Sequence, residues 1–379
     1  MRKQLVLGVL TMLASPVAAQ NFWHPEIGIQ GGYARLKPAG TGRSDAIDLI
    51  EFPTPGYVAP LLAYSSLYAL IPAGRRLAIE PTLSFANLSE STGGDATTAR
   101  VGLRADLAFS SSFYGAAGAI MNNLQSGGNH ATQFGAQVAA GYRFVLTPTL
   151  DGRLEASMTA TQKRRPGLGP EDTYALLFGV SSRLDRAPAA RGAPRGGAPS
   201  GAWQPSIGVT GGYSAIKGDG TNLMITGVFL PGFGGSAPAL TGGGTFLPQV
   251  PTLFAILPLG RRIAFEPGVD LHRIQSNGRT VFSANLAGRF DYAVVGGWYA
   301  ALGAHEDWIK GTKGSFTDTT KTSVGITGAS VAWGYRFHLA GDLGARTELN
   351  YVAFAKNESA KTPAMNTVSI LFSLSMPLK

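Results

Sequence analysis

The chain has 379 residues, enough for two or three ordinary domains, and 44% of them are hydrophobic while only 15% are charged. It is too apolar for an intrinsically disordered protein, and its 51 glycines follow no Gly-X-Y period, which excludes collagen. The absence of cysteine excludes disulfide scaffolds, thiolate metal sites and cysteine nucleophiles. The formal net charge is +9, but the basic residues are spread singly, so we expect no nucleic-acid partner.

Residues 1–19 have the three-part pattern of a secretory signal peptide. Arg2 and Lys3 precede an apolar stretch at residues 5–14, and small residues lead up to Ala19. The apolar stretch is about half as long as the roughly 20 residues that a membrane-spanning helix needs. We therefore predict that the protein is exported and that residues 1–19 are cleaved.

The remainder of the chain contains the same motifs twice. The motif W-x-P-x-I-G-x-x-G-G-Y begins at Trp23 and again at Trp203, and the motif R-x-D begins at Arg104 and again at Arg289. A period of roughly 185 residues is too long for a solenoid repeat and indicates a duplicated domain. We predict a first copy at residues 20–186, a linker rich in Ala, Pro, Gly and Arg at 187–202, and a second copy at 203–379.

Apolar and polar residues alternate with period two in eight segments of each copy, which predicts antiparallel β-strands and an all-β fold. In the first copy these segments are 24–36, 58–71, 76–88, 97–109, 112–123, 131–146, 150–162 and 172–184. In the second copy they are 204–217, 248–258, 261–274, 280–292, 297–309, 324–338, 343–355 and 366–378.

The predicted connections alternate between short turns and longer loops. In the first copy the longer connections are 37–57, 89–96, 124–130 and 163–171, and the spacing between the copies changes only within such loops. Long strands with tight turns at one end and variable loops at the other are typical of up-and-down barrels in the bacterial outer membrane. We therefore predict a transmembrane barrel in that membrane, with a soluble exported barrel or sandwich as the alternative.

The two faces of the predicted strands differ in a way that favours lipid over water. Residues 134–144 place Phe134, Val138 and Tyr142 on one face, whereas Gly135 and Gln137 lie on the other. A face of small residues with a few charges suits a narrow barrel interior. A sheet in lipid must also close, because lipid offers no hydrogen-bond partner to the backbone groups of an open edge. We expect an interfacial girdle from the aromatic residues beside the tight turns, which are Phe113, Tyr142, Phe144, Trp298, Tyr335 and Phe337.

Charged residues recur at interior positions in both copies. Buried charge is tolerated only when it is paired and hydrogen-bonded, and each copy supplies equal numbers of arginines and acids. We interpret the set as a structural plug of ion pairs, with a charged constriction lining a pore as the alternative. The predicted interior network comprises Glu80, Arg104, Asp106, Arg143, Arg153, Glu155, Glu266, Arg289, Asp291, Arg336, Arg346 and Glu348.

The strand at residues 141–144, the turn at 147–150 and the Arg-x-Glu motif at Arg153 and Glu155 resemble the small eight-stranded outer-membrane barrels of the OmpA transmembrane-domain and opacity-protein type. The resemblance covers each copy separately. It implies an outer-membrane location, with both termini inside and the long loops outside. It also implies contact with outer-membrane lipid, lipopolysaccharide and the barrel-assembly machinery.

Two further groups of residues are candidate sites. His272, His305, Asp270 and Asp307 share interior parity near the loop end of the second copy, as a general base or metal ligands would, or as part of the polar plug. No activated serine stands at a diagnostic spacing, so we predict no enzyme, no catalytic or metal residues and no cofactor. A second group, the basic run Lys163, Arg164 and Arg165 in a predicted loop, is a candidate contact to lipopolysaccharide phosphates.

The sequence thus supports three functions. The first is a pair of tandem eight-stranded barrels with a structural or surface-interaction role through extracellular loops, whose partner the sequence does not name. The second is a single sixteen-stranded porin for small solutes, and the third is a lipid-modifying enzyme. The sixteen-residue linker favours tandem barrels, because a simple turn needs only a few residues.

Overall fold

The computed structural model describes most of the chain and consists of β-strands. It describes residues 22–38, 46–52, 64–65, 67–90, 95–126, 129–147, 150–162, 171–185, 202–218, 224–229, 251, 253–276, 279–311, 323–340, 343–358 and 364–378. Among these residues, no helix is long and apolar enough to cross a membrane. The predicted all-β, antiparallel barrel fold is confirmed.

Nine strands lie in the described part of each copy. Those of the first copy are β1 (Glu26–Pro38), β2 (Ile47–Phe52), β3 (Leu67–Pro72), β4 (Leu77–Glu90), β5 (Asp95–Ala108), β6 (Phe113–Ser126), β7 (Asn129–Thr147), β8 (Leu150–Thr161) and β9 (Glu171–Arg183). Those of the second copy are β10 (Ser206–Gly218), β11 (Met224–Phe229), β12 (Leu253–Pro258), β13 (Ile263–Ser276), β14 (Arg279–Val295), β15 (Trp298–Gly311), β16 (Ser323–Ala340), β17 (Leu343–Phe354) and β18 (Met365–Pro377).

The expectation of eight strands per copy was wrong at one place in each repeat. Strands β2 and β11 occupy segments that alternation assigned to the first loops. Within the predicted second strands, 58–71 and 248–258, the structure describes β3 and β12, whereas residues 58–63 and 248–250 lie outside the described part. The connection predicted at 124–130 is only two residues, 127–128, because β6 and β7 both extend further than their alternation suggested.

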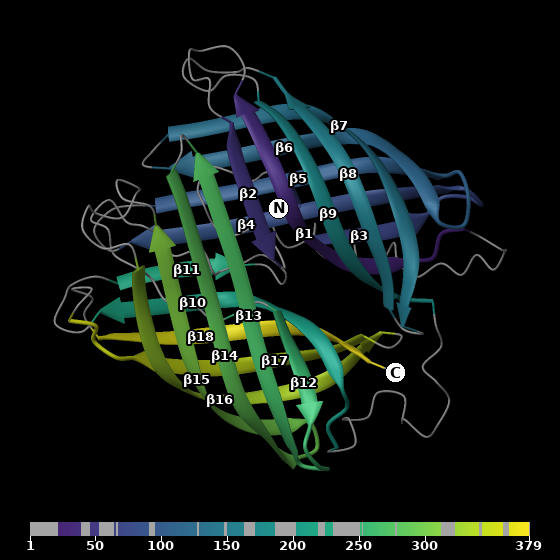
Figure 1. The fold of residues 1–379 in the computed structure, drawn as a ribbon. Helices are drawn as coiled ribbons and strands as arrows, with labels where there is room; N and C mark the ends of the chain where they lie inside the picture. Colours follow the sequence, from purple (N-terminus) through teal and green to yellow (C-terminus); the bar gives the residue numbers. More distant parts are fainter. Residues whose placement is uncertain are drawn as a thin grey trace.

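At the end where short turns join the strands, which we call the turn end, the sheet forms two separate rings. Strand β1 pairs with β9 along its whole length and with β3 at residues 26–29, and β3 pairs with β4. Together with β5 to β8 these strands close a ring of eight. Strand β10 likewise pairs with β18 and β12, which closes a second ring of eight through β13 to β17. Figure 1 shows the two barrels one above the other.

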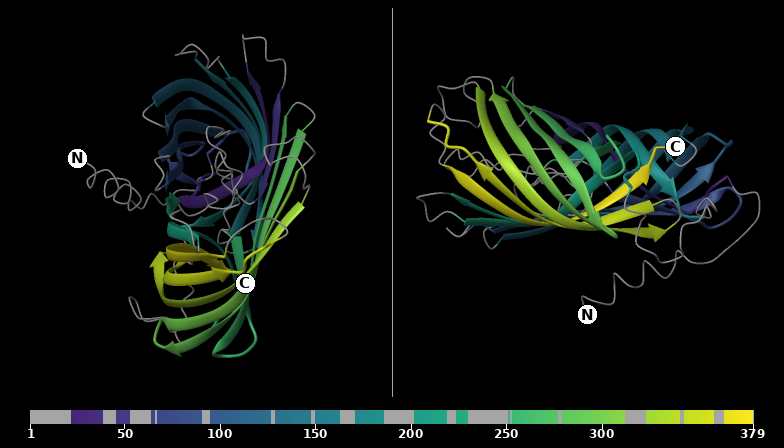
Figure 2. Two further views of the ribbon diagram at one scale, coloured as in Figure 1. Left: turned by 90° about the vertical axis from the view of Figure 1, so that its left-hand side faces the viewer. Right: turned by 90° about the horizontal axis from the view of Figure 1, so that it is seen from below.

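At the opposite end, the loop end, the two rings merge. Strand β2 lies between β1 and β13 of the other copy, and β11 lies between β10 and β4 of the other copy. The loop-end circuit is therefore a single ring of sixteen strands, in which each copy gives one short strand to the wall of its partner. Two views at right angles show sheet running without a break from one barrel into the other (Figures 1 and 2). We call the ring of sixteen strands at the loop end the waist, and the two rings of eight strands at the turn end the legs.

Glycine marks the point where the rings divide. Strand β1 pairs with β3 up to Ile29 and with β2 from Gly32, whose φ of 156° is a conformation that other residues rarely adopt. A Cβ on Gly32 would lie 2.2 Å from the backbone oxygen of Leu176. Gly212, the same position of the repeated motif, has a φ of 152° and starts the pairing of β10 with β11. The backbone amide of Gly32 donates a hydrogen bond to the hydroxyl of buried Tyr64, at 3.1 Å.

The two legs also pack against each other through apolar side chains. Leu150, Val209, Leu343 and Leu374 point out of their own barrels, yet all four are buried, because the wall of one barrel covers the wall of the other. Ile27 and Ile207, at equivalent positions of the repeat, pack against the same cluster. The contact thus has the two-fold character of a symmetric dimer within a single chain.

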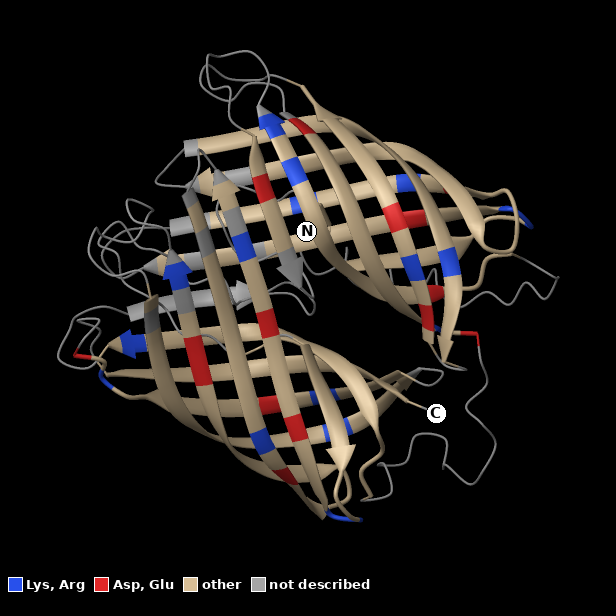
Figure 3. Cartoon of the chain, in the orientation of Figure 1, with Lys and Arg blue, Asp and Glu red and all other residues tan. Residues whose placement is uncertain are grey.

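Most other described residues on the outward faces of the strands are apolar, and most of the described charged residues lie inside the barrels. Leu103 is 58% exposed and Leu302 is 66% exposed, whereas charged residues on the opposite face of the same strands are buried. Figure 3 shows acidic and basic positions spaced along the strands of both barrels. The expected aromatic girdle lies beside the turns: the rings of Phe113 and Tyr142 are 4.9 Å apart, and those of Trp298 and Tyr335 are 5.1 Å apart.

Candidate functional site: the charged interior of each barrel

An interlocked set of ion pairs fills the turn-side half of the first barrel. Arg104 on β5 reaches Glu155 on β8 with two hydrogen bonds, of 2.8 and 2.6 Å, and also contacts Glu80 at 2.9 Å. Its Nε lies 3.0 Å from Asp106. Arg153 bonds the other side of Glu80 at 2.5 Å, so the chain of pairs crosses the lumen from wall to wall. Register places Glu80 directly opposite Arg104 on neighbouring strands, which sets this geometry locally.

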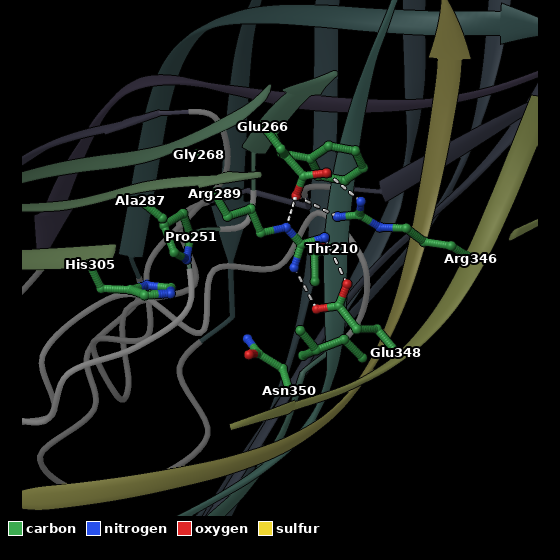
Figure 4. A pocket seen from close by; sticks show the side chains of 12 residues that line it. Thr210, Pro251, Glu266, Gly268, Ala287, Arg289, His305, Arg346, Glu348 and Asn350 are labelled. Atoms are coloured by element: carbon green, nitrogen blue, oxygen red, sulfur yellow. Dashed lines mark hydrogen bonds and ion pairs between the residues drawn. The ribbon is translucent and has the colours of Figure 1, made fainter. Parts of the chain in front are cut away.

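The second barrel repeats the arrangement. Arg289 donates to both oxygens of Glu348 at 2.7 Å and lies 3.0 Å from Glu266 and 3.1 Å from Asp291. Arg346 bonds both oxygens of Glu266. The structure therefore brings together five of the six predicted interior residues of each copy into one network. Figure 4 shows the second network, with Arg289 between Glu266 and Glu348.

Buried tyrosines complete the networks, and glycines make room for them. The hydroxyls of Tyr114 and Tyr299 each donate to the network glutamate, Glu155 or Glu348, at 2.6 Å. Gly334 lies across from Tyr299, and a Cβ there would be 2.5 Å from the tyrosine hydroxyl. Small interior residues such as Gly334 thus leave space for large side chains that extend from the neighbouring strand.

A tryptophan covers the turn end of each lumen, and sequence reasoning assigned it no role. Trp23 donates to the backbone oxygen of Arg76 at 2.8 Å and meets the ring of Tyr114 edge-on at 5.5 Å. Trp203 donates to the oxygen of Arg262 at 3.0 Å and meets Tyr299 in the same way. The repetition of Trp at the start of both motifs was the signal, because a fully buried indole needs a hydrogen-bond partner.

The sixth predicted residue of each copy differs between the barrels. Arg143 stacks 4.7 Å from Trp23 and forms an ion pair with Glu26, an interior acid that the sequence analysis missed. Arg336 stacks 3.7 Å from Trp203, but Ser206 stands where Glu26 does, and among the described residues Arg336 has no acidic partner. The turn-end cation is therefore neutralised in one copy and held mainly by the indole face in the other.

The remaining candidates have mixed outcomes. His272, His305, Asp270 and Asp307 are all buried on the inner faces of β13 and β15, where their parity placed them. In the described ranges, no group of three or more histidine and carboxylate side chains converges as metal ligands would. Lys163, Arg164 and Arg165 lie outside the described residues, as do residues 1–21 and nearly all of the linker, so these stay predictions.

Comparison with known proteins adds little to this geometry. No family model and no curated protein matches the sequence. Among solved structures, a bacterial polysaccharide outer membrane secretin has a TM-score of 0.33 at 10% identity, covering 95% of this chain and 100% of its own. The CymD monoaromatic hydrocarbon channel has a TM-score of 0.29 at 8% identity, covering 95% and 89%. The β domain of the Bordetella autotransporter BrkA has a TM-score of 0.27 at 12% identity, covering 80% and 99%. At TM-scores below 0.5, these likenesses carry no argument.

Proposed function

We propose that this protein is an integral outer-membrane barrel whose legs do not conduct, and that it serves a structural or surface-interaction role through its loop end. The membrane part rests on the outward surface. Leu103, Leu302 and Ile370 are each more than half exposed on strands whose inner faces are polar. Soluble proteins rarely expose apolar patches of such extent, whereas lipid-facing barrel strands require them.

The non-conducting part rests on one observation: ion pairs and a tryptophan close both lumens over their turn-side halves. An eight-stranded ring is just wide enough for its own side chains to fill. Here Arg104 and Arg289 each reach glutamates on two other strands, with guanidinium–carboxylate distances of 3.0 Å or less. Below them Trp23 and Trp203 seal the turn ends. The sixteen-stranded ring is confined to the loop end, where it forms a waist above two closed legs.

Planar-bilayer recording tests this proposal. The full chain, refolded in detergent and inserted into the bilayer, should show no stable conductance step. A matched variant, Trp203→Ala with Arg336→Ala, removes the seal of one leg and should give at most small, brief events. Large stable steps from the unmodified chain would refute the non-conducting role and favour the porin alternative.

Membrane insertion has its own test. We expect the exported chain to sediment with outer membranes on ultracentrifugation and to need detergent for release. A chain that stays dissolved without detergent would refute the membrane location. We also propose lipopolysaccharide and barrel-assembly contacts and the absence of enzymatic activity; unchanged lipid profiles on expression of the chain and of His305→Ala would support the latter.

A further inference from the structure

One short turn of each leg carries a pair of arginines that is the same in both copies. The turn between β3 and β4 reads P-A-G-R-R-L and ends at Leu77, and the turn between β12 and β13 reads P-L-G-R-R-I and ends at Ile263. The other short turns differ: residues 109–113 read F-S-S-S-F where 294–298 read V-V-G-G-W, and T-P-T at 147–149 is A-G-D in the second copy. We call the two pairs the arginine doublets; they are Arg75 with Arg76, and Arg261 with Arg262.

The fold uses the backbone of these turns but does not use the arginine side chains. The carbonyl oxygen of Arg76 accepts hydrogen bonds from the indole of Trp23 and from a backbone amide of β5, both at 2.8 Å. The carbonyl oxygen of Arg262 accepts the equivalent bonds from Trp203 at 3.0 Å and from β14 at 2.8 Å. Any residue can supply this carbonyl. The bonds therefore fix the position of each turn, but they do not explain why both copies have two arginines there.

The arginine doublets are exposed, and among the described residues none of their guanidinium groups has an acidic partner. Two acids near the turn end of the first leg are already paired, Asp151 with Arg183 and Asp185 with His24. In the first doublet both guanidinium groups lie beside the ring of Phe22, at 5.9 and 5.7 Å from its centre, so the two side chains converge. Each doublet therefore presents two adjacent positive charges that an anion from outside the chain can reach.

The apolar outer surface of each leg begins directly beside its doublet. Leu77 and Ile263, the residues that follow the doublets, are exposed on the outward face of β4 and β13. In the second leg, Nη1 of Arg262 donates to the hydroxyl of Tyr292 at 3.4 Å, and Tyr292 is itself an exposed, outward-facing residue of β14. Tyrosine hydroxyls on a lipid-facing wall lie at the level of the lipid headgroups. This contact thus places a guanidinium at headgroup depth on the outer wall of the leg.

We propose that each arginine doublet binds the headgroup phosphate of an anionic phospholipid in the leaflet at the turn end. The inference rests on the proposed membrane location, and it does not depend on whether the legs conduct. Guanidinium groups bind phosphate oxygens through two parallel hydrogen bonds, and the short turns of outer-membrane barrels face the periplasm. An acidic periplasmic protein fits less well, because the exposed side chains of Leu77 and Ile263 beside the doublets suit acyl chains.

Native mass spectrometry of the refolded full chain in detergent tests the proposal by counting the lipid molecules that stay bound. Phosphatidylglycerol is the probe, and zwitterionic phosphatidylcholine with the same acyl chains is the control. We expect two phosphatidylglycerol molecules per chain, one for each doublet, at concentrations at which phosphatidylcholine does not bind. The preference should amount to roughly fivefold per arginine, and it should decrease as ionic strength rises because the charges are exposed.

Matched double variants show which lipid belongs to which doublet. Arg75→Gln with Arg76→Gln should remove one of the two bound phosphatidylglycerol molecules, and Arg261→Gln with Arg262→Gln should remove the other. The control is Arg35→Gln with Arg273→Gln, which removes two exposed arginines near the loop end and should leave both lipids bound. Heat-modifiable mobility on gels confirms that each variant has folded.

The outcomes separate this inference from the membrane location on which it rests. A chain that fails to sediment with lipid vesicles refutes the membrane location. A chain that does insert, but binds the two lipids equally or keeps both phosphatidylglycerol molecules in the folded doublet variants, overturns only the lipid site. Binding of a polyglutamate peptide by the doublets, without any preference for phosphatidylglycerol, would overturn it too and would assign the doublets to an acidic protein.

Discussion

Replacing Arg104 with methionine tests whether the ion pairs hold the first barrel together. Arg104 is buried and lies within 3.0 Å of three carboxylates, on Glu80, Asp106 and Glu155. Arg104→Met leaves these acids with Arg153 as their one remaining network cation. Removing one partner from a buried pair typically costs about 3–5 kcal/mol, so we expect the free energy of unfolding to fall by about that amount. Arg104→Lys keeps the charge but loses the forked geometry, and should cost roughly 1–3 kcal/mol.

Urea unfolding in lipid vesicles provides the measurement, with tryptophan fluorescence as the signal. Trp23 is the single tryptophan of the first copy and contacts Tyr114, whose hydroxyl bonds the network glutamate. Arg289→Met should produce a similar loss in the second copy. Arg35→Met is the control, because Arg35 is 55% exposed and lies 3.8 Å from Asp48, a surface pair worth at most about 1 kcal/mol. A loss below about 1 kcal/mol for Arg104→Met would show that the network is not a principal source of stability.

Three further experiments test the outer wall, the packing and the strand exchange. Leu302→Arg should cost roughly 2–4 kcal/mol in vesicles if lipid covers this face, but almost nothing in a soluble barrel, and unfolding titrations decide between them. Gly334→Val should lower the unfolding midpoint, because its Cβ would lie 2.5 Å from a buried tyrosine hydroxyl; an unchanged midpoint would contradict this packing. A cysteine pair at Ile50 and Arg273, which are paired in β2 and β13, should form a disulfide in this cysteine-free chain, detectable by peptide mass spectrometry. A disulfide between cysteines at Ile50 and Asn87, the equivalent position on β4, would instead show that the strands are not exchanged.

Most of the interior could be read from the sequence because parity in a strand is a local property. Successive side chains alternate between faces, so Glu80, Arg104 and Glu155 had to share the face opposite the exposed leucines once their segments were strands. Charge balance predicted that these residues form ion pairs inside the ring, but only the structure assigned the individual pairs. The roles of Trp23 and Glu26 were missed for different reasons. Trp23 precedes the predicted first strand, and Glu26, which lies within it, does not recur in the second copy, where Ser206 replaces it.

The sequence by itself determined most of the β-strands, the inward charges and the repeated motifs, since these depend on spacing along the chain. Only the tertiary structure decided which copy each short strand joins. Strand β2 pairs with β13 of the second copy, although β4 has the equivalent edge within the first copy. Strand β11 of the second copy pairs with that edge of β4 in return. Because both edges offer the same backbone hydrogen-bonding groups, local pattern cannot choose between them. Long-range geometry decides the pairing. The legs pack their apolar walls against each other, and the glycines at positions 32 and 212 allow β1 and β10 to change partner strands.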